Sequence, residues 1–135
     1  MPSVPAALAD PTPGPVPDPT RLRFAAMMVA VGLLHFVAPR PFRRIVPRWF
    51  PWPEEAVLVS GVAEVAAGVL VAVPRTRRAG GWLSLLTIAA VYPANLQMAY
   101  DATWGESQVE VPAWAAWLRV PMQFPMLRQA WQLTR

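Results

Sequence analysis

Four long apolar segments alternate along the chain with short segments rich in arginine and proline. The apolar segments cover residues 24–38, 56–73, 81–99 and 113–131, and each contains 15 to 19 residues. A helix of about 20 residues crosses the hydrocarbon core of a bilayer, and flanking arginines let a shorter one span by extending their charged ends to the interface. The pattern therefore predicts an all-α membrane protein, a bundle of four transmembrane helices.

The fourth apolar segment is the least regular. It contains the polar residues Arg119, Gln123 and Arg128 and two prolines, Pro121 and Pro125. Proline is tolerated in a transmembrane helix where neighbouring groups satisfy the freed carbonyls, and tryptophans near both ends of the segment are typical interfacial anchors. We expect this segment to span the membrane as well.

The connector between the first two apolar segments has an amphipathic pattern. Its large apolar residues fall at i, i+3, i+4, i+7 and i+8, which places them on one helical face, with most of the arginines off that face. These apolar residues are Phe42, Ile45, Val46, Trp49 and Phe50. The connector is predicted to be a short interfacial amphipathic segment in which Pro47 ends or kinks any helix. The alternative is a tight turn whose arginines contact lipid phosphates.

Residues 1–20 differ from the rest of the chain in composition. Seven prolines fall within them, and few large apolar side chains are present to offset the entropy of ordering. We expect a disordered tail at 1–20 and a membrane domain at 21–135. The tail lacks the basic start and apolar run of a secretory signal, so the first helix is expected to remain as an anchor.

Composition narrows the possible functions. Apolar residues make up 55% of the chain and charged residues only 15%, and the twelve basic residues are all arginines placed between apolar segments. This distribution is typical of membrane proteins and disfavours nucleic-acid binding. The chain has no cysteine and one histidine, His35. We therefore expect no thiol, haem or metal chemistry from the chain itself.

The arginines also predict the orientation in the membrane. With four spans, seven arginines lie on the side that carries both termini and the 74–80 loop, against four in the 40–48 connector. The side with more positive charge usually faces the cytoplasm. We expect a multi-pass protein of the bacterial cytoplasmic membrane with both termini in the cytoplasm and the 101–111 loop outside.

Among the polar residues inside the predicted spans, five fall in the outward half of the bundle. An ionised side chain there costs roughly 2.5 to 3.5 kcal/mol on insertion scales, so each requires a partner or a function. Counted from the ends of the apolar segments, two of them, Glu64 and Arg119, lie roughly 9 to 12 Å deep. Gly61 and Gly68 share the face of Glu64 and should allow a neighbouring helix to approach closely. We predict one intramembrane cluster of His35, Glu64, Asn95, Arg119 and Gln123.

The cluster has two interpretations. In one, a buried ion pair between Glu64 and Arg119 fixes the packing of the helices and the other three residues complete its hydrogen bonds. In the other, the cluster forms a polar pocket that binds a small amphipathic molecule, such as the head group of a quinone, or passes protons to it. A cavity in contact with the cluster would favour the second interpretation, and a solid bundle with a direct ion pair would favour the first.

Short motifs in all four apolar segments and in the connector resemble the DoxX family of small bacterial membrane proteins. The resemblance covers residues 32–131 and rests on His35-Phe36, Pro39, Phe42, Ile45-Val46-Pro47, Trp49, Pro51, Ser60-Gly61, Glu64, Gly68, Pro93-Ala94-Asn95, Trp117, Arg119, Pro121 and Gln123 in this order and spacing.

The resemblance implies four transmembrane helices and, as partners, the lipid bilayer and other membrane or redox proteins. Relatives in the family include DoxD-type subunits associated with thiosulfate:quinone oxidoreductase and MauE-type proteins linked to methylamine dehydrogenase maturation. Three functions remain open: a quinone- or small-molecule-binding subunit of a redox complex, a non-catalytic scaffold or assembly factor, and a small transporter, which would require a homo-oligomer. The absence of cysteine counts against thiol exchange.

Overall fold

The computed structural model describes residues 18–105 and 111–135, and this part of the chain is helical, without strands. Its elements are α1 (Asp18–Val37), α2 (Pro39–Arg44), α3 (Pro53–Ala72), the 3-10 turn η2 (Pro74–Thr76), α4 (Arg77–Trp104) and α5 (Ala113–Leu133). The four long helices coincide with the four apolar segments, which confirms the all-α prediction. The predicted disordered tail lies outside the described residues up to residue 17.

The start of α1 and the end of α4 differ from the expectation. Residues 18–20 begin α1, because a proline is tolerated in the first turn of a helix and Asp18 favours that turn through the helix dipole. The helix α4 continues beyond residue 99 to Trp104, and Gln97 donates a hydrogen bond of 2.9 Å to the buried Asp101 one turn later. The prolines inside α4 and α5 do not end these helices, as expected.

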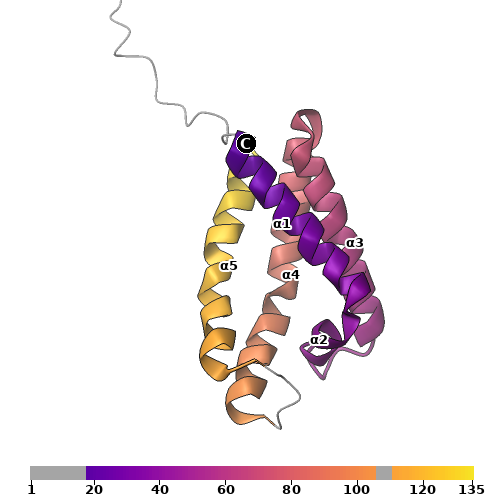
Figure 1. The fold of residues 1–135 in the computed structure, drawn as a ribbon, viewed down its shortest axis with the longest axis vertical. Coiled ribbons are helices and arrows are strands. Elements are labelled where there is room, and N and C mark those ends of the chain that lie inside the picture. Colours follow the sequence, from indigo (N-terminus) through magenta and orange to yellow (C-terminus); the bar gives the residue numbers. More distant parts are fainter. Residues whose placement is uncertain (1–17, 106–110) are drawn as a thin grey trace, which may run out of the picture.

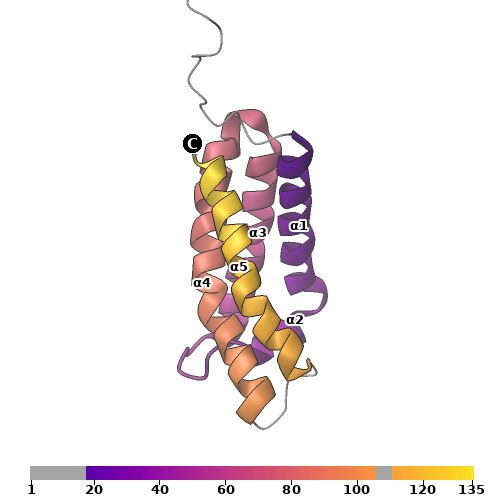
Figure 2. The ribbon, with the colours of Figure 1, turned by 90° about the vertical axis from the view of Figure 1, so that its left-hand side faces the viewer.

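The long helices pack as antiparallel neighbours in chain order, α1 on α3, α3 on α4 and α4 on α5 (Figures 1 and 2). Figure 1 shows α1 and α5 converging near the C-terminus and diverging toward α2. The converging end is filled by a hydrophobic core of Phe24, Ala25, Met28, Ala67, Val71, Ile88, Ala130 and Leu133. We call this end the closed half of the bundle and the end near α2 the open half.

Glycines set the close approach of α1 and α3. A Cβ atom on Gly68 would lie 2.7 Å from the carbonyl oxygen of Ala25, and one on Gly61 would lie 2.8 Å from the Cβ of His35. Gly32 on α1 allows the same close approach to α3, because a Cβ atom on it would lie 2.8 Å from the amide nitrogen of Val65. The prediction that Gly61 and Gly68 admit a neighbouring helix is confirmed.

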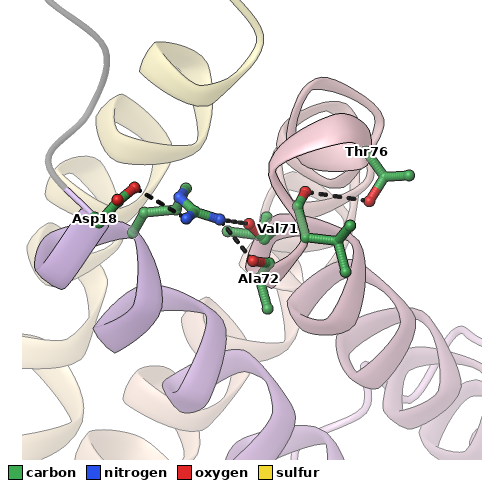
Figure 3. A network of polar contacts seen from close by, with 6 residues as sticks. Asp18, Val71, Ala72 and Thr76 are labelled. Atoms are coloured by element: carbon green, nitrogen blue, oxygen red, sulfur yellow. Dashed lines mark hydrogen bonds and ion pairs between the residues drawn. The ribbon is translucent and has the colours of Figure 1, made fainter.

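An arginine caps the C-terminal end of α3, in the closed half of the bundle (Figure 3). Arg21 of α1 is buried, and its Nη1 donates hydrogen bonds of 2.8 Å and 2.7 Å to the carbonyl oxygens of Val71 and Ala72, while Nη2 contacts Asp18 at 3.0 Å. Thr76 donates a further bond of 2.8 Å to the carbonyl oxygen of Leu70. These donors satisfy carbonyls that a helix C-terminus leaves free, and a cation at that end is favoured by the helix dipole.

Two of the helices, α1 and α3, are long and apolar enough to cross a membrane, with a mean hydropathy of 1.4 and 1.8 over 18 residues. Only 33% of each of these stretches is buried inside the protein. Most residues of these stretches are therefore exposed or only partly buried in the protein.

Candidate functional site

A cavity of about 870 Å³ lies in the open half of the bundle. The connector, α3 and α4 form its walls, and α1 and α5 contribute residues at its sides. The cavity lies within the usual range of small-molecule sites, roughly 300 to 1,000 Å³, and most of its lining is apolar, as such sites require.

The amphipathic connector forms one wall of this cavity. The helical part, α2, ends at Arg44, before Pro47, as the proline predicted. All five residues of the apolar stripe line the cavity. Arg44 is exposed, and the partly buried Arg43 pairs with Glu54 at 2.8 Å. The stripe is therefore partly buried against the bundle, except for Trp49, which is 74% exposed.

Four of the five predicted cluster residues line the cavity, namely His35, Glu64, Asn95 and Arg119. The fifth, Gln123, is buried in α5 but does not line it. Its Oε1 atom has no hydrogen-bond partner among the described residues. The structure therefore does not bring Gln123 to the cavity lining, although it shares one face of α5 with Arg119.

Helix register divides the cavity's polar residues into two levels. Gly80 lies against Val71, so seven residues further along the antiparallel pair Thr87 is level with Glu64. Trp117 of α5 donates a hydrogen bond of 2.8 Å to Thr103 of α4, so Arg119, two residues further along α5, lies toward the same end of α4 as Asn95. We call Glu64 and Thr87 the inner level, which adjoins the closed half, and Asn95 and Arg119 the outer level. Eight residues of α4 separate the two levels, about 12 Å along its axis.

This register corrects the predicted ion pair between Glu64 and Arg119. No ion pair joins the two residues in the part of the chain that the structure describes, and Arg119 is exposed at the edge of the cavity. The predicted depths assumed that the helices begin at equal heights. In the structure α4 runs past its expected end, and the helix contacts offset Arg119 of α5 from Glu64 of α3 along the bundle.

The inner level contains a carboxyl group that lies close to a histidine but makes no hydrogen bond through its Oε2 atom to other described residues. His35 Nδ1 lies 2.8 Å from the carbonyl oxygen of Val31 and 3.3 Å from Glu64 Oε2. Since a carbonyl oxygen only accepts, Nδ1 carries the proton and donates a hydrogen bond to the carbonyl oxygen of Val31. Glu64 is only 7% exposed, and its Oε2 has no hydrogen-bond partner among the described residues. The ring of Phe42 stacks on His35 with centroids 3.8 Å apart and fixes the imidazole in place.

Sequence reasoning missed two residues of this site, Thr87 and Trp52, which also line the cavity. A threonine in an apolar helix is commonly bonded to its own backbone, as Ser60 is to the carbonyl oxygen of Ala56 at 2.7 Å. Only the register of α4 against α3 shows that Thr87 is level with Glu64. Trp52 lies just past the amphipathic stripe, and helical spacing did not include it.

The chain was compared with known proteins. No curated protein and no solved structure matches it. A family described as a domain of unknown function, DUF8561, matches residues 24–134, which include the connector, the cavity and nearly all of the four long helices. The chain therefore belongs to the DUF8561 family.

Proposed function

We propose that this chain is a DoxX-like protein of the bacterial cytoplasmic membrane that binds a small amphipathic molecule, such as a quinone, as a subunit of a membrane redox complex. The observation that carries the proposal is the cavity itself. It combines apolar walls with polar groups, the carboxyl group of Glu64 and the amide of Asn95, which make no hydrogen bond to other described residues. A scaffold would instead be expected to have a solid core, with its polar groups paired.

The surface of the bundle supports four membrane spans. Large apolar side chains face outward on every long helix, including Leu33 on α1, Val59 on α3, Leu86 on α4 and Phe124 on α5, each at least 50% exposed. Since α4 packs lengthwise on α3, and α5 on α4, a bilayer that contains α3 contains all of them. Both termini then lie on the side of the closed half, which the arginine distribution assigns to the cytoplasm.

A binding measurement tests the proposal. The protein is reconstituted in lipid nanodiscs and titrated with decylubiquinone, while the tryptophan fluorescence is recorded. Trp49 and Trp52 line the cavity, so a bound quinone should quench their emission saturably. The Ala90→Phe variant places a ring in the cavity and should abolish the saturable component. The matched control is Ala89→Phe, one residue away on α4 and outside the cavity lining.

Two results would count against the proposal. Quenching that rises linearly with quinone, as in empty nanodiscs with free tryptophan, would indicate partition into lipid only. Equal saturable quenching in the Ala90→Phe and Ala89→Phe variants would place the binding site elsewhere on the protein.

A further inference from the structure

We infer that this cavity prefers a ligand that carries a hydrogen-bond donor on an apolar body, such as a hydroxyl group of a quinol, and that presents the donor to Glu64 at the inner level. The inference rests on the proposed binding function and specifies the chemistry of the ligand. It follows from a count of donors and acceptors around Glu64.

The inner level has more acceptors than donors. The protonated Nδ1 of His35 is the nitrogen nearest to Glu64, and it is already bonded to the carbonyl oxygen of Val31 at 2.8 Å. Oε2 of Glu64 is buried without a hydrogen bond. A buried acceptor without a donor costs free energy comparable to a lost hydrogen bond, and a ligand that supplies the donor recovers it.

The donors of the outer level make no hydrogen bond or ion pair with Glu64 in the part of the chain that the structure describes. Asn95 lies eight residues beyond Thr87 on α4, about 12 Å along the helix axis. Arg119 is exposed and in none of the ion pairs of the described residues. The unmet acceptor at Glu64 is therefore built into the fold, since the register that separates the two levels is fixed by glycine contacts.

The walls around the inner level specify the rest of the ligand. Phe42, which stacks on the ring of His35, and Ala63, next to Glu64 on α3, are apolar and line the same cavity, as does Val31 of α1. An apolar body would fill this space, and the ligand's donor would lie at its inner end. The hydroxyl group of Thr87 can donate or accept, so it can form a hydrogen bond with a ligand group of either kind.

Three probes with one alkyl body test the inference by isothermal titration calorimetry in nanodiscs, with empty nanodiscs subtracted. They are 4-heptylphenol, which donates, 4-heptylanisole, which does not, and 4-heptyl-N,N,N-trimethylanilinium, which is cationic without a donor. We expect the phenol to bind about tenfold or more tightly than the anisole, as for a hydrogen bond to a carboxylate. The Glu64→Met variant should bind the two neutral probes equally.

Gln123→Met is the matched control. It also removes a buried oxygen without a partner, but outside the cavity lining, so it should keep the preference for the phenol. The comparison of probes on the unmodified protein tests the inference even if Glu64→Met fails to fold.

Each other outcome overturns a different statement. Equal binding of phenol and anisole would refute the donor requirement and leave the binding function standing. Tightest binding of the anilinium would show that Glu64 recognises a cation instead of a donor. No binding of any probe, together with no saturable quinone quenching, would overturn the binding function itself.

Discussion

Replacing Gly68 by alanine tests how closely α1 and α3 pack in the closed half. The new methyl group would lie 2.7 Å from the carbonyl oxygen of Ala25 and 2.6 Å from a side-chain methyl of Val29. An ordinary contact begins at 3.4 Å, so the backbone of α1 must move by about 0.7 Å, while Val29 can rotate. The contact with the backbone therefore decides the outcome.

Two opposing effects set the magnitude for Gly68→Ala. Alanine favours a helix over glycine by about 1 kcal/mol, which would stabilise α3. Overpacking that forces a backbone shift costs typically about 1 to 3 kcal/mol, and the loss of close helix contact in a membrane adds to it. We expect a net decrease of about 1 to 2 kcal/mol in the free energy of unfolding.

The measurement for Gly68→Ala is unfolding by sodium dodecyl sulfate from mixed micelles, followed by circular dichroism. Val69→Ala, the next residue, is the control because Val69 is exposed, and it should change the free energy of unfolding by less than about 0.5 kcal/mol. An increase in stability of about 1 kcal/mol for Gly68→Ala would show that helix propensity dominates. The close approach of α1 and α3 would then be wrong.

Three further predictions concern the charged residues and the orientation. Arg21→Met should lower the free energy of unfolding by about 2 to 4 kcal/mol in the same assay, because two backbone acceptors lose a charged donor, whereas the exposed Arg23→Met should change it little. In a double-mutant cycle of Glu64→Gln and Arg119→Gln, the effects on stability should add within about 0.5 kcal/mol, and a larger coupling would restore the direct ion pair. A Ser107→Cys variant should react with an impermeant maleimide from outside the cell, and reaction from the cytoplasmic side only would reverse the orientation.

The sequence predicted the helices because each depends on local pattern. The apolar segments, the end of α2 before Pro47 and the stripe on the connector follow from periodicity and proline chemistry alone. Gly61 and Gly68 were also predicted correctly as contact positions, since they share one helical face with Glu64. These features can be predicted without knowing the register of one helix against another.

The composition of the site depends on helix register, which the sequence did not reveal. Glu64 and Arg119 seemed level because both were counted from the ends of apolar segments. The actual offset is set by contacts such as that of Gly81 with Leu133, between residues more than fifty positions apart. The same register brings Thr87 level with Glu64, and Gln123 does not line the cavity although its spacing from Arg119 suggested that it would.

The two halves of the bundle divide stability from binding. In the closed half, the hydrophobic core and the Arg21 bonds satisfy apolar and polar groups alike. In the open half, Glu64 remains without a donor although it is buried. A fold tolerates such a deficit when other contacts compensate for it, and an unsatisfied group is most useful where a ligand can reach it. Gly68→Ala should therefore reduce the free energy of unfolding, while the folded molecules keep their preference for the phenol over the anisole. Ala90→Phe should abolish binding with little loss of stability. If both variants lost both properties in parallel, the cavity would be part of the folding core, and the separation of the two halves would not hold.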